Sequence, residues 1–179
     1  MSIQEERSSR MKSQDLIAGP WHAAIFRVRY QETDQMGVVY HSNYLNWFEI
    51  GRTEMLRELG FTYAGLESQG VLLPVLSAEL NYKRSARYDD LVVVYTRMTA
   101  FTPLRITYDY EIRRAAEEDS KISVPESGFC EAPGGELLVT GSTAHAWVSR
   151  EMRPVRLDRT LPDAYNAIWS ALEQKGGAL

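Results

Sequence analysis

The sequence predicts an α+β fold in which a mostly antiparallel sheet wraps around one long central helix. Apolar residues recur at spacings of three and four from Tyr44 to Leu59, a pattern typical of one amphipathic helix. Stretches with the period of two or the β-branched content of strands lie before and after it. A sheet with one apolar face needs a cover, and this helix is the only sizeable candidate before the C-terminus. We therefore expect the sheet to curve around it.

The chain begins with a polar segment and continues into a strand. Residues 1–20 are rich in Ser, Gln, Glu and Arg, which support little burial, so we expect a mobile N-terminal arm. Ala24–Gln31 is predicted to be the first strand, because Phe26, Val28 and Tyr30 alternate with polar residues.

The long helix has recognisable signals at both ends. A turn-like segment at residues 33–37 precedes it, and Ser42 and Asn43 are both good N-cap residues. Gly60 is well placed to end the helix. Gly51 lies on the apolar stripe, where the missing side chain would let the helix backbone approach the sheet closely.

The rest of the chain is predicted to be mainly strands. The expected elements are a helical turn at Thr62–Ser68, strands at Val71–Lys83, Leu91–Phe101, Leu104–Arg113 and Glu136–Arg150, and a C-terminal helix at Asp163–Gln174. The strand at residues 71–83 is expected to be largely buried, with Pro74 at a bulge or an edge. The next two strands should form an antiparallel hairpin. In the last strand the candidate core residues are Leu138, Ala144, Ala146 and Val148.

The segment before the last strand exceeds the usual length of a loop. Residues 115–135 contain an acidic run, two prolines and three glycines, and they indicate an irregular, exposed hairpin connection. Such a segment is either mobile or adapted for contacts. With this insertion and the C-terminal helix, residues 21–179 are expected to form a single domain.

Composition narrows the class of protein. With 179 residues, 44% of them hydrophobic and 25% charged, the chain is ordinary for one soluble globular domain. The formal net charge of −4 does not favour binding to nucleic acid or to an anionic membrane. The single cysteine, Cys130, excludes an intrachain disulfide, and no apolar run reaches the ~20 residues of a membrane helix. We therefore expect a cytoplasmic protein without membrane insertion.

A carboxylate just before the helix start is the most suggestive chemical feature. Asp34 precedes the backbone N–H groups that carry the positive end of the helix dipole. Such groups can stabilise an oxyanion, while the carboxylate attacks a carbonyl or activates water against it. Together they would transfer an acyl group to water. The competing interpretation is structural, because aspartate in a turn usually serves the turn itself.

The same segment resembles the signature of a known enzyme family. From Tyr30 to Glu54 the chain reads Y-x-E-T-D-x-M-G-V-V-Y-H-S-N-Y-x-x-W-F-E-x-G-R-T-E. This resembles hotdog-fold acyl-CoA thioesterases of the 4-hydroxybenzoyl-CoA thioesterase branch, which includes the Tol-Pal-associated enzymes. Looser similarity continues at Pro74–Asp90 and Gly141–Val148. The resemblance implies the hotdog fold, hydrolysis of a short-chain or aromatic acyl-CoA to free acid and CoA, no cofactor, and a homodimer or homotetramer.

The resemblance also implies roles for individual residues. Asp34 matches the catalytic aspartate of the family, which acts as nucleophile or general base. His41, seven residues later, matches the position whose backbone N–H faces the thioester oxygen, although a structural histidine near a helix start is the competing interpretation. Glu49 matches a carboxylate with a supporting role, although a solvated helix carboxylate is the competing interpretation. Tyr40 is assigned to the substrate-binding side of the site, where it packs rather than reacts.

A cluster of cations precedes the turn at residues 88–90. Lys83, Arg84 and Arg87 could hold the phosphates of CoA through charge-assisted hydrogen bonds, as related enzymes do with basic residues at subunit edges. The structural alternative is the solvated end of a strand. The sequence therefore predicts a phosphate site that Arg84 and its two neighbours share.

Other chemistries are not favoured by the sequence. The histidines His22, His41 and His145 and the lone Cys130 lack metal-ligand spacing, and no serine-nucleophile, P-loop or dinucleotide motif is present. Two alternatives to thioester hydrolysis stay open. One is a hotdog hydratase or dehydratase, in which His41 and a carboxylate move protons. The other is a non-catalytic acyl-carrier or envelope-complex partner that uses residues 115–135 as its contact.

Overall fold

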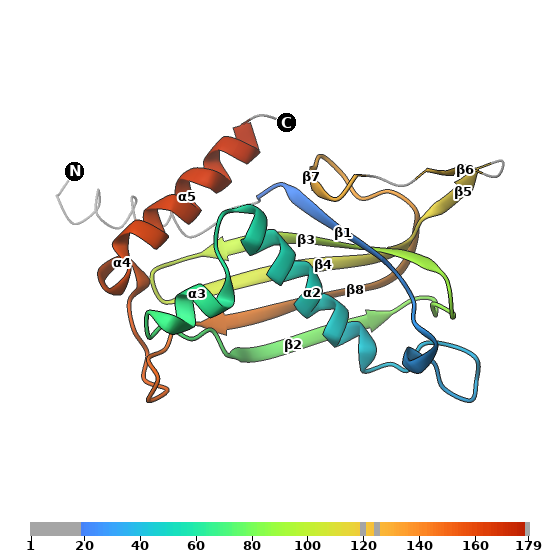
Figure 1. Ribbon diagram of the computed structural model, residues 1–179, viewed down its shortest axis with the longest axis horizontal. Coiled ribbons are helices and arrows are strands. Elements are labelled where there is room, and N and C mark those ends of the chain that lie inside the picture. Colours follow the sequence, from blue (N-terminus) through green and yellow to red (C-terminus); the bar gives the residue numbers. More distant parts are fainter. Residues whose placement is uncertain (1–18, 119–120, 124–125, 178–179) are drawn as a thin grey trace, which may run out of the picture.

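The computed structural model describes residues 19–118, 121–123 and 126–177. A six-stranded sheet curves around one long helix, α2 (Asn43–Glu58), as Figure 1 shows. The sheet consists, in spatial order, of β2 (Val75–Tyr82), β8 (Glu136–Ala146), β4 (Arg105–Arg114), β3 (Leu91–Phe101), β1 (Trp21–Arg27) and β7 (Gly128–Cys130), and every neighbouring pair is antiparallel. The predicted α+β fold is thereby confirmed.

The elements outside this sheet are η1 (Tyr30–Glu32), α3 (Tyr63–Ser68), β5 (Ala116–Glu118), β6 (Lys121–Ser123), α4 (Leu157–Thr160) and α5 (Pro162–Gly177).

The N-terminal arm predicted for residues 1–20 falls mostly outside the described residues, which begin at Gly19. Gly19 and Pro20 are buried, and the backbone N–H of Gly19 donates to the carbonyl of Met98 at 3.1 Å. These two residues therefore belong to the packed domain rather than to an arm.

The first strand begins earlier and ends earlier than the alternation predicts. β1 starts at Trp21 because β7 and β3 pair with its first residues from opposite sides. It ends at Arg27, where the expected strand to Gln31 gives way to the short 3-10 helix η1. Beyond Arg27 the predicted alternation holds only in part, because Val28 is buried and exchanges backbone hydrogen bonds with Asp89 and Asp90, whereas Tyr30 is 78% exposed and begins η1.

One face of α2 packs into the concave side of the sheet. The buried residues of the helix are Tyr44, Trp47, Phe48, Gly51, Met55 and Leu56. Phe48 stacks on Tyr110 of β4, with ring centroids 4.1 Å apart. A Cβ on Gly51 would overlap Thr96 Oγ1 and lie 2.8 Å from Val94 Cγ1. The close approach predicted at Gly51 is confirmed.

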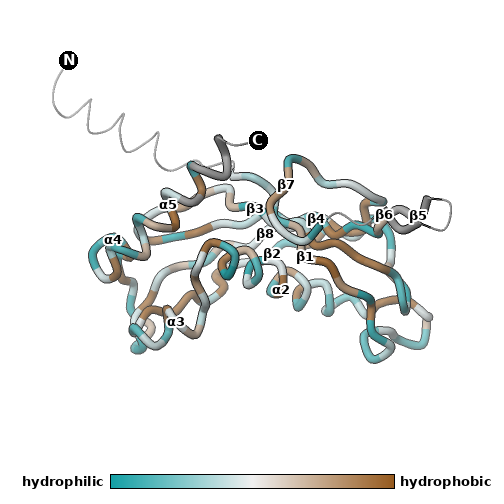
Figure 2. The backbone as a smooth tube through the Cα atoms, turned by 45° about the horizontal axis from the view of Figure 1, so that its top comes forward, coloured by the Kyte–Doolittle hydropathy of each residue, from teal (hydrophilic) through white to brown (hydrophobic). Residues whose placement is uncertain are grey.

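The helix α5 extends the core at one end of the sheet. Phe101, at the end of β3, stacks on Tyr165 and Trp169 of α5 at centroid distances of 5.1 and 6.1 Å. Brown, hydrophobic stretches lie mainly along the strands and teal stretches mainly at the turns (Figure 2). No helix in the described part of the chain combines the length and apolarity needed to cross a membrane.

The predicted strand at residues 71–83 differs from expectation in burial. Among the described residues, β2 pairs only with β8 and forms an edge of the sheet, and seven of its eight residues are exposed. Val75 and Leu76 are 49% and 52% exposed. The prediction of a largely buried strand was wrong, because apolar content does not report where a strand lies in the sheet. Pro74 does precede an edge strand, as expected.

The connection at residues 115–135 is more ordered than the sequence indicates. β5 and β6 form a two-stranded ladder, and β7 pairs with β1 as the sixth strand of the main sheet. The prediction of an irregular connection was wrong for these strands. A strand of three residues carries too few positions for a period of two to be recognised. The acidic run of this connection is residues 117–119, and its last residue lies outside the described ranges.

In β8 and the residues after it, the core-facing set is only partly the predicted one. Leu138 and Val148 are buried, whereas Ala144 and Ala146 are half-buried on the opposite face. The residues that alternate into the core there are Thr143, His145 and Trp147. The prediction of Ala144 and Ala146 as core residues was wrong, because hydropathy selects the alanines whereas the polar residues Thr143 and His145 are the buried ones.

Candidate active site

Asp34 lies in a tight loop between η1 and α2. An antiparallel bridge between Thr33 and Val39 closes the loop, and Gly37 takes a φ of +72° to complete the turn. One carboxylate oxygen of Asp34 accepts a hydrogen bond from the backbone N–H of Met36 at 2.8 Å. Among the described residues, the other oxygen accepts no hydrogen bond from the protein. The half-buried carboxylate therefore serves the turn with one oxygen and keeps the other available for chemistry.

Glu32 ties this loop to the start of the helix. Its carboxylate accepts hydrogen bonds from the indole N–H of Trp47 at 2.9 Å and from the backbone N–H of Arg29 at 2.7 Å. Its carbonyl accepts from the side-chain amide of Asn43 at 2.8 Å and from the backbone N–H of Tyr40 at 2.9 Å. Sequence reasoning missed this role. The only signal was the place of Glu32 two residues before Asp34 in the motif.

The backbone around His41 is held from both sides. The Val39 N–H donates to the carbonyl of Ala86, and the Tyr40 carbonyl accepts from the Asn43 N–H, each at 2.9 Å. The His41 carbonyl accepts from the Tyr82 hydroxyl at 3.1 Å. Within the described ranges, the N–H of His41 itself donates to no protein acceptor. A rigid frame thus presents one unengaged backbone donor beside the start of α2.

The side chains of Tyr40 and His41 both lie on the surface. Their ring centroids are 4.4 Å apart, and Tyr40 is 48% exposed. The other two histidines lie elsewhere. His22 bonds Glu58 at 3.0 Å, whereas burial and the nearby positive charge of Arg52 lower the pKa of His145 to about 4. His145 is therefore neutral at pH 7.

Glu49 lies on the exposed side of α2. Its carboxylate is 3.5 Å from the guanidinium of Arg52. It lines a groove of about 590 Å³ together with Glu32 and Asn43, which bond each other beside the Asp34 loop, whereas neither Asp34 nor His41 itself lines the groove. Asp34, Tyr40 and His41 lie in one segment of the chain, and Glu49 lines the neighbouring groove along α2.

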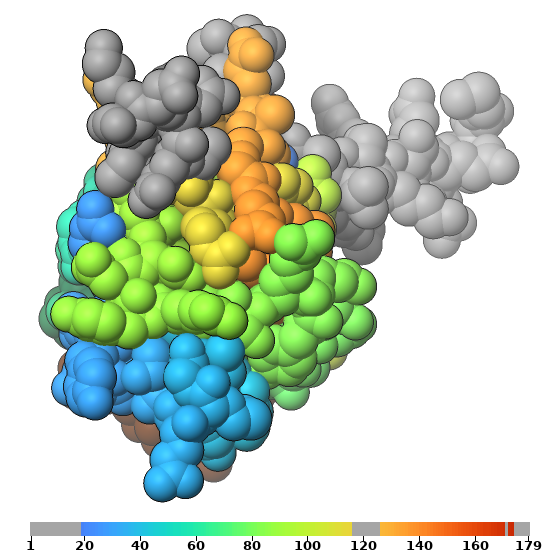
Figure 3. Space-filling model, turned by 90° about the vertical axis from the view of Figure 1, so that its right-hand side faces the viewer, coloured from blue at the N-terminus to red at the C-terminus, as the bar shows by residue number. Residues whose placement is uncertain are grey.

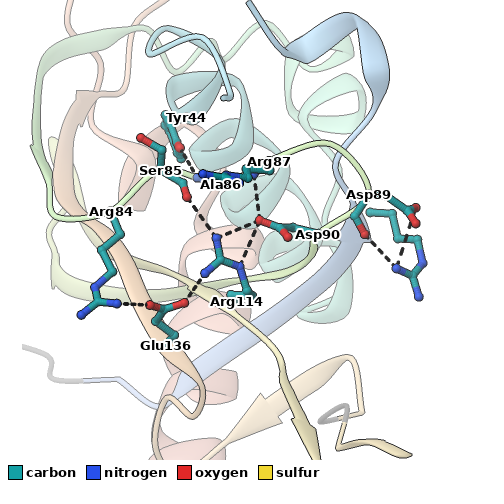
Figure 4. Close-up of polar contacts among 10 residues, drawn as sticks. Tyr44, Arg84, Ser85, Ala86, Arg87, Asp89, Asp90, Arg114 and Glu136 are labelled. Carbon is teal, nitrogen blue, oxygen red and sulfur yellow. Dashed lines mark hydrogen bonds and ion pairs between the residues drawn. The ribbon is translucent and has the colours of Figure 1, made fainter. Parts of the chain in front are cut away.

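The three predicted phosphate ligands have different surroundings. Arg84 bonds Glu136 at 2.6 Å, and Glu136 also pairs with Arg114 (Figure 4). For Lys83 and Arg87, which are also exposed, the described part of the chain provides no ion pair. The sequence missed Glu136 as a partner because 52 residues separate it from Arg84.

The cations and the Asp34 loop occupy the same end of the molecule. In Figure 3 the green segment that follows β2 lies directly against the blue segment that contains Asp34. The hydrogen bond between Val39 and Ala86 joins the two segments. A ligand could therefore span both the cations and the Asp34 loop.

Within the ranges that the structure describes, no three side chains of His, Cys, Asp or Glu are grouped so as to hold a metal ion.

Comparison with known proteins shows which family this chain is similar to. Residues 36–121 match the family model of the thioesterase superfamily. YneP of Bacillus subtilis (strain 168), which carries the name of an acyl-CoA thioesterase, is 36% identical over 141 residues, or 78% of this chain and 89% of YneP. The acyl-CoA thioesterase YbgC of Haemophilus influenzae is 38% identical over 99 residues, or 55% of this chain and 73% of YbgC.

A solved structure agrees with both the fold and the sequence match. The DHNA-CoA thioesterase from Staphylococcus aureus has a TM-score of 0.72 and 35% identity, and the match covers 89% of this chain and 95% of that one. The resemblance in the Asp34 segment, the sheet wrapped around α2 and these relatives agree with one another. The chain belongs to the thioesterase superfamily and is a hotdog-fold thioester hydrolase.

Proposed function

We propose that this protein hydrolyses an acyl-CoA with a short-chain or aromatic acyl group to the free acid and CoA. The observation that carries the proposal is that one short segment holds two groups without a hydrogen-bond partner among the described residues, the second carboxylate oxygen of Asp34 and the backbone N–H of His41. The names of the relatives support CoA thioesters as substrates, since YneP and YbgC are named for acyl-CoA and the Staphylococcus aureus enzyme for DHNA-CoA.

The proposed reaction begins at the thioester carbonyl, with the carbonyl oxygen toward the His41 N–H. As a general base, Asp34 takes a proton from water while the water oxygen bonds the carbonyl carbon. The oxyanion collapses, the C–S bond breaks, and the CoA thiolate receives the proton. As a nucleophile, Asp34 instead forms a mixed anhydride and releases CoA, and water then hydrolyses the anhydride. Single turnover in ¹⁸O-labelled water distinguishes the two, because only the anhydride route can leave label in the Asp34 carboxylate.

The direct test is a thiol-release assay of purified protein against short, long, branched and aromatic acyl-CoAs. Turnover that favours short or aromatic acyl groups supports the proposal. A hotdog hydratase would change enoyl-CoA absorbance without releasing thiol, and a non-catalytic partner would bind acyl-CoA and release none. Either result would contradict thioester hydrolysis by this site.

We assign Glu49 a supporting role and place Tyr40 on the substrate-binding side of the site. Glu49 could serve the site of Asp34 from its own chain, since the groove that it lines includes Glu32 and Asn43 beside the Asp34 loop, or from a second copy of the chain. The exposure of Glu49 on α2 is compatible with such a contact. Tyr40 contributes an exposed ring next to the donor at His41.

The proposed site at the nucleotide end consists of Lys83, Arg84 and Arg87. Because Arg84 already pairs with Glu136, Lys83 and Arg87 should contribute most of the attraction to phosphate. Replacing both by alanine is expected to raise KM for acyl-CoA by about 3- to 10-fold, since exposed ion pairs are individually weak. The kcat should stay nearly constant, because such contacts bind ground state and transition state alike.

Two comparisons make this expectation specific. A truncated acyl thioester without the nucleotide should show no difference between the double variant and the wild type. Arg105→Ala, which removes another exposed cation, should leave KM for the full substrate unchanged. An unchanged KM in the double variant at low salt would identify these cations as a solvated strand end.

The edge of the sheet supports a homodimer, and a tetramer would be a dimer of such dimers. β7 covers β1 at one edge, whereas β2 is exposed at the other edge along with Val75 and Leu76. Unpaired backbone groups next to exposed apolar side chains favour pairing with another strand. We expect light scattering to give at least a dimer at micromolar concentration. Leu76→Arg should shift it toward monomer and reduce turnover, whereas a stable, active monomer of the wild type would contradict the prediction.

The proposal also covers domain organisation and location. We place the activity in a single domain over residues 21–179, extended by the buried Gly19 and Pro20, with the insertion at residues 115–135 contributing β7 to the sheet. A cytoplasmic location is supported by the single, partly buried thiol of Cys130, which suits a reducing compartment. Fluorescence microscopy of a tagged chain, with fractionation of cell extracts, tests this location.

A further inference from the structure

The connection between β2 and β3 contacts the backbone on both sides of His41. Ala86 lies in this connection and is fully buried. Its carbonyl accepts a hydrogen bond from the N–H of Val39, two residues before His41, at 2.9 Å. Its own N–H donates to the hydroxyl of Tyr44, three residues after His41, also at 2.9 Å. One residue therefore holds the two ends of the segment that presents the His41 N–H.

A side chain from a distant strand fixes the position of this connection. Arg114, at the end of β4, donates from Nη2 to the Ser85 carbonyl at 3.0 Å and from Nε to the Asp90 carboxylate at 3.0 Å (Figure 4). Its Nη1 group pairs with Glu136. The same Asp90 oxygen accepts from the N–H of Arg87 at 2.8 Å and closes the turn after Ala86. Arg114 thus holds the connection immediately before and after Ala86.

The hydrogen bonds of Arg114 within the protein favour a structural role over a role as a phosphate ligand. All three nitrogens of its guanidinium donate to acceptors within the protein. A planar fork of this kind fixes several acceptors at once, which a lysine ammonium cannot reproduce. The contacts around Ala86 are buried, so a shift of the connection would leave its N–H or carbonyl without a partner, at a cost comparable to a lost hydrogen bond.

We propose that Arg114 is a positioning residue for thioester hydrolysis, because it holds Ala86 in place and Ala86 in turn sets the orientation of the His41 N–H. This inference rests on the proposed function, in which that N–H stabilises the oxyanion. Arg114 touches neither Asp34 nor His41, so its effect passes through the backbone of residues 85–90. A small displacement of a pre-organised donor affects the transition state more than substrate binding.

The test compares Arg114→Lys with a matched control, Arg113→Lys. Arg113 is the neighbouring residue of β4 and also bonds one carboxylate, Glu111, and one carbonyl, Gly135, but in the described part of the chain it makes no hydrogen bond or ion pair with residues 85–90. Arg114→Lys is expected to lower kcat by about 10-fold with KM within about 2-fold. Arg113→Lys should leave both constants within about 2-fold of wild type. A fall in kcat of equal size in both variants would overturn the proposal.

Amide hydrogen exchange gives a readout that does not depend on catalysis. In ¹⁵N-labelled full-length protein, the Ala86 and Val39 amides should exchange at least about 10-fold faster in Arg114→Lys and at the wild-type rate in Arg113→Lys. Amides in the centre of β3 and β4 should keep their protection in both variants. Unchanged exchange at Ala86 would overturn the proposal, because the connection would then not depend on Arg114.

The two readouts also separate this inference from the proposed function. Faster exchange at Ala86 with unchanged kcat would overturn the positioning role, while loss of turnover in Asp34→Asn would leave the proposed function standing. Full turnover in folded Asp34→Asn would overturn the proposed site without reference to Arg114. If Arg114→Lys does not fold, Glu136→Gln removes one carboxylate of the same network at constant size and should show the same two changes, each at about 3-fold.

Discussion

Replacing Asp34 by asparagine is expected to lower kcat by ~100-fold or more while the fold and the oligomeric state stay intact. The substitution removes the charge that a nucleophile or a general base requires. An asparagine side chain keeps a carbonyl oxygen, which can still accept the hydrogen bond from the Met36 N–H. The turn should therefore survive, and the loss of rate should report the chemistry.

The measurement is the steady-state release of thiol, with circular dichroism and light scattering on the same preparation. Asp89→Asn is the matched control, because Asp89 also lies in an exposed turn and its φ of 66° is one that asparagine tolerates well. Its carboxylate lies 3.8 Å from Arg27 and contacts none of the proposed catalytic groups. Wild-type kcat in correctly folded Asp34→Asn, or an equal loss in Asp89→Asn, would remove Asp34 from the mechanism.

Replacing Gly51 by alanine is expected to lower the free energy of unfolding by about 2 kcal/mol. The new Cβ would overlap Thr96 Oγ1 and lie 2.8 Å from Val94 Cγ1, and overpacking of this kind costs up to about 3 kcal/mol. The higher helix propensity of alanine offsets about 1 kcal/mol of that cost. Because Gly51 holds α2 close to β3, a shift of the helix should also lower kcat.

A second substitution tests whether the overlap is the cause. Thr96 Oγ1 is buried and has no hydrogen-bond partner among the described residues. Thr96→Ala therefore removes an atom that would clash with the new Cβ at position 51, without breaking a hydrogen bond. In urea titrations, the double variant should recover at least about 1 kcal/mol relative to the sum of the single changes. Full additivity, or a Gly51→Ala protein as stable as the wild type, would contradict the close packing described here.

Local patterns predicted the elements whose geometry depends on their own sequence. The β-rich run at Leu91–Phe101 matches β3 at both ends, and the helix predicted from Tyr44 to Leu59 matches α2 within one residue. Gly51 was identified from its place on the apolar stripe. These predictions succeeded because side-chain periods of two and 3.6 are properties of the backbone itself.

The order of strands in the sheet could not be obtained in the same way. β2 has the apolar content of a buried strand, yet it lies at an edge, and β7 joins the sheet from a segment without a recognisable period. Which strands pair depends on the whole path of the chain. A strand's own residues report its period but not the number of its neighbours.

For the candidate site as well, the sequence determined some features and the tertiary structure decided others. The sequence by itself determined the Asp34 segment and the family, because a long motif lies within one continuous stretch. Only the tertiary structure decided that Arg84 pairs with Glu136, that Glu32 bonds Trp47 and that Arg114 holds the connection around Ala86. Hydrogen bonds need atoms about 3 Å apart in space. Residues separated by 15 to 52 positions reach that distance only when the sheet has assembled around the helix.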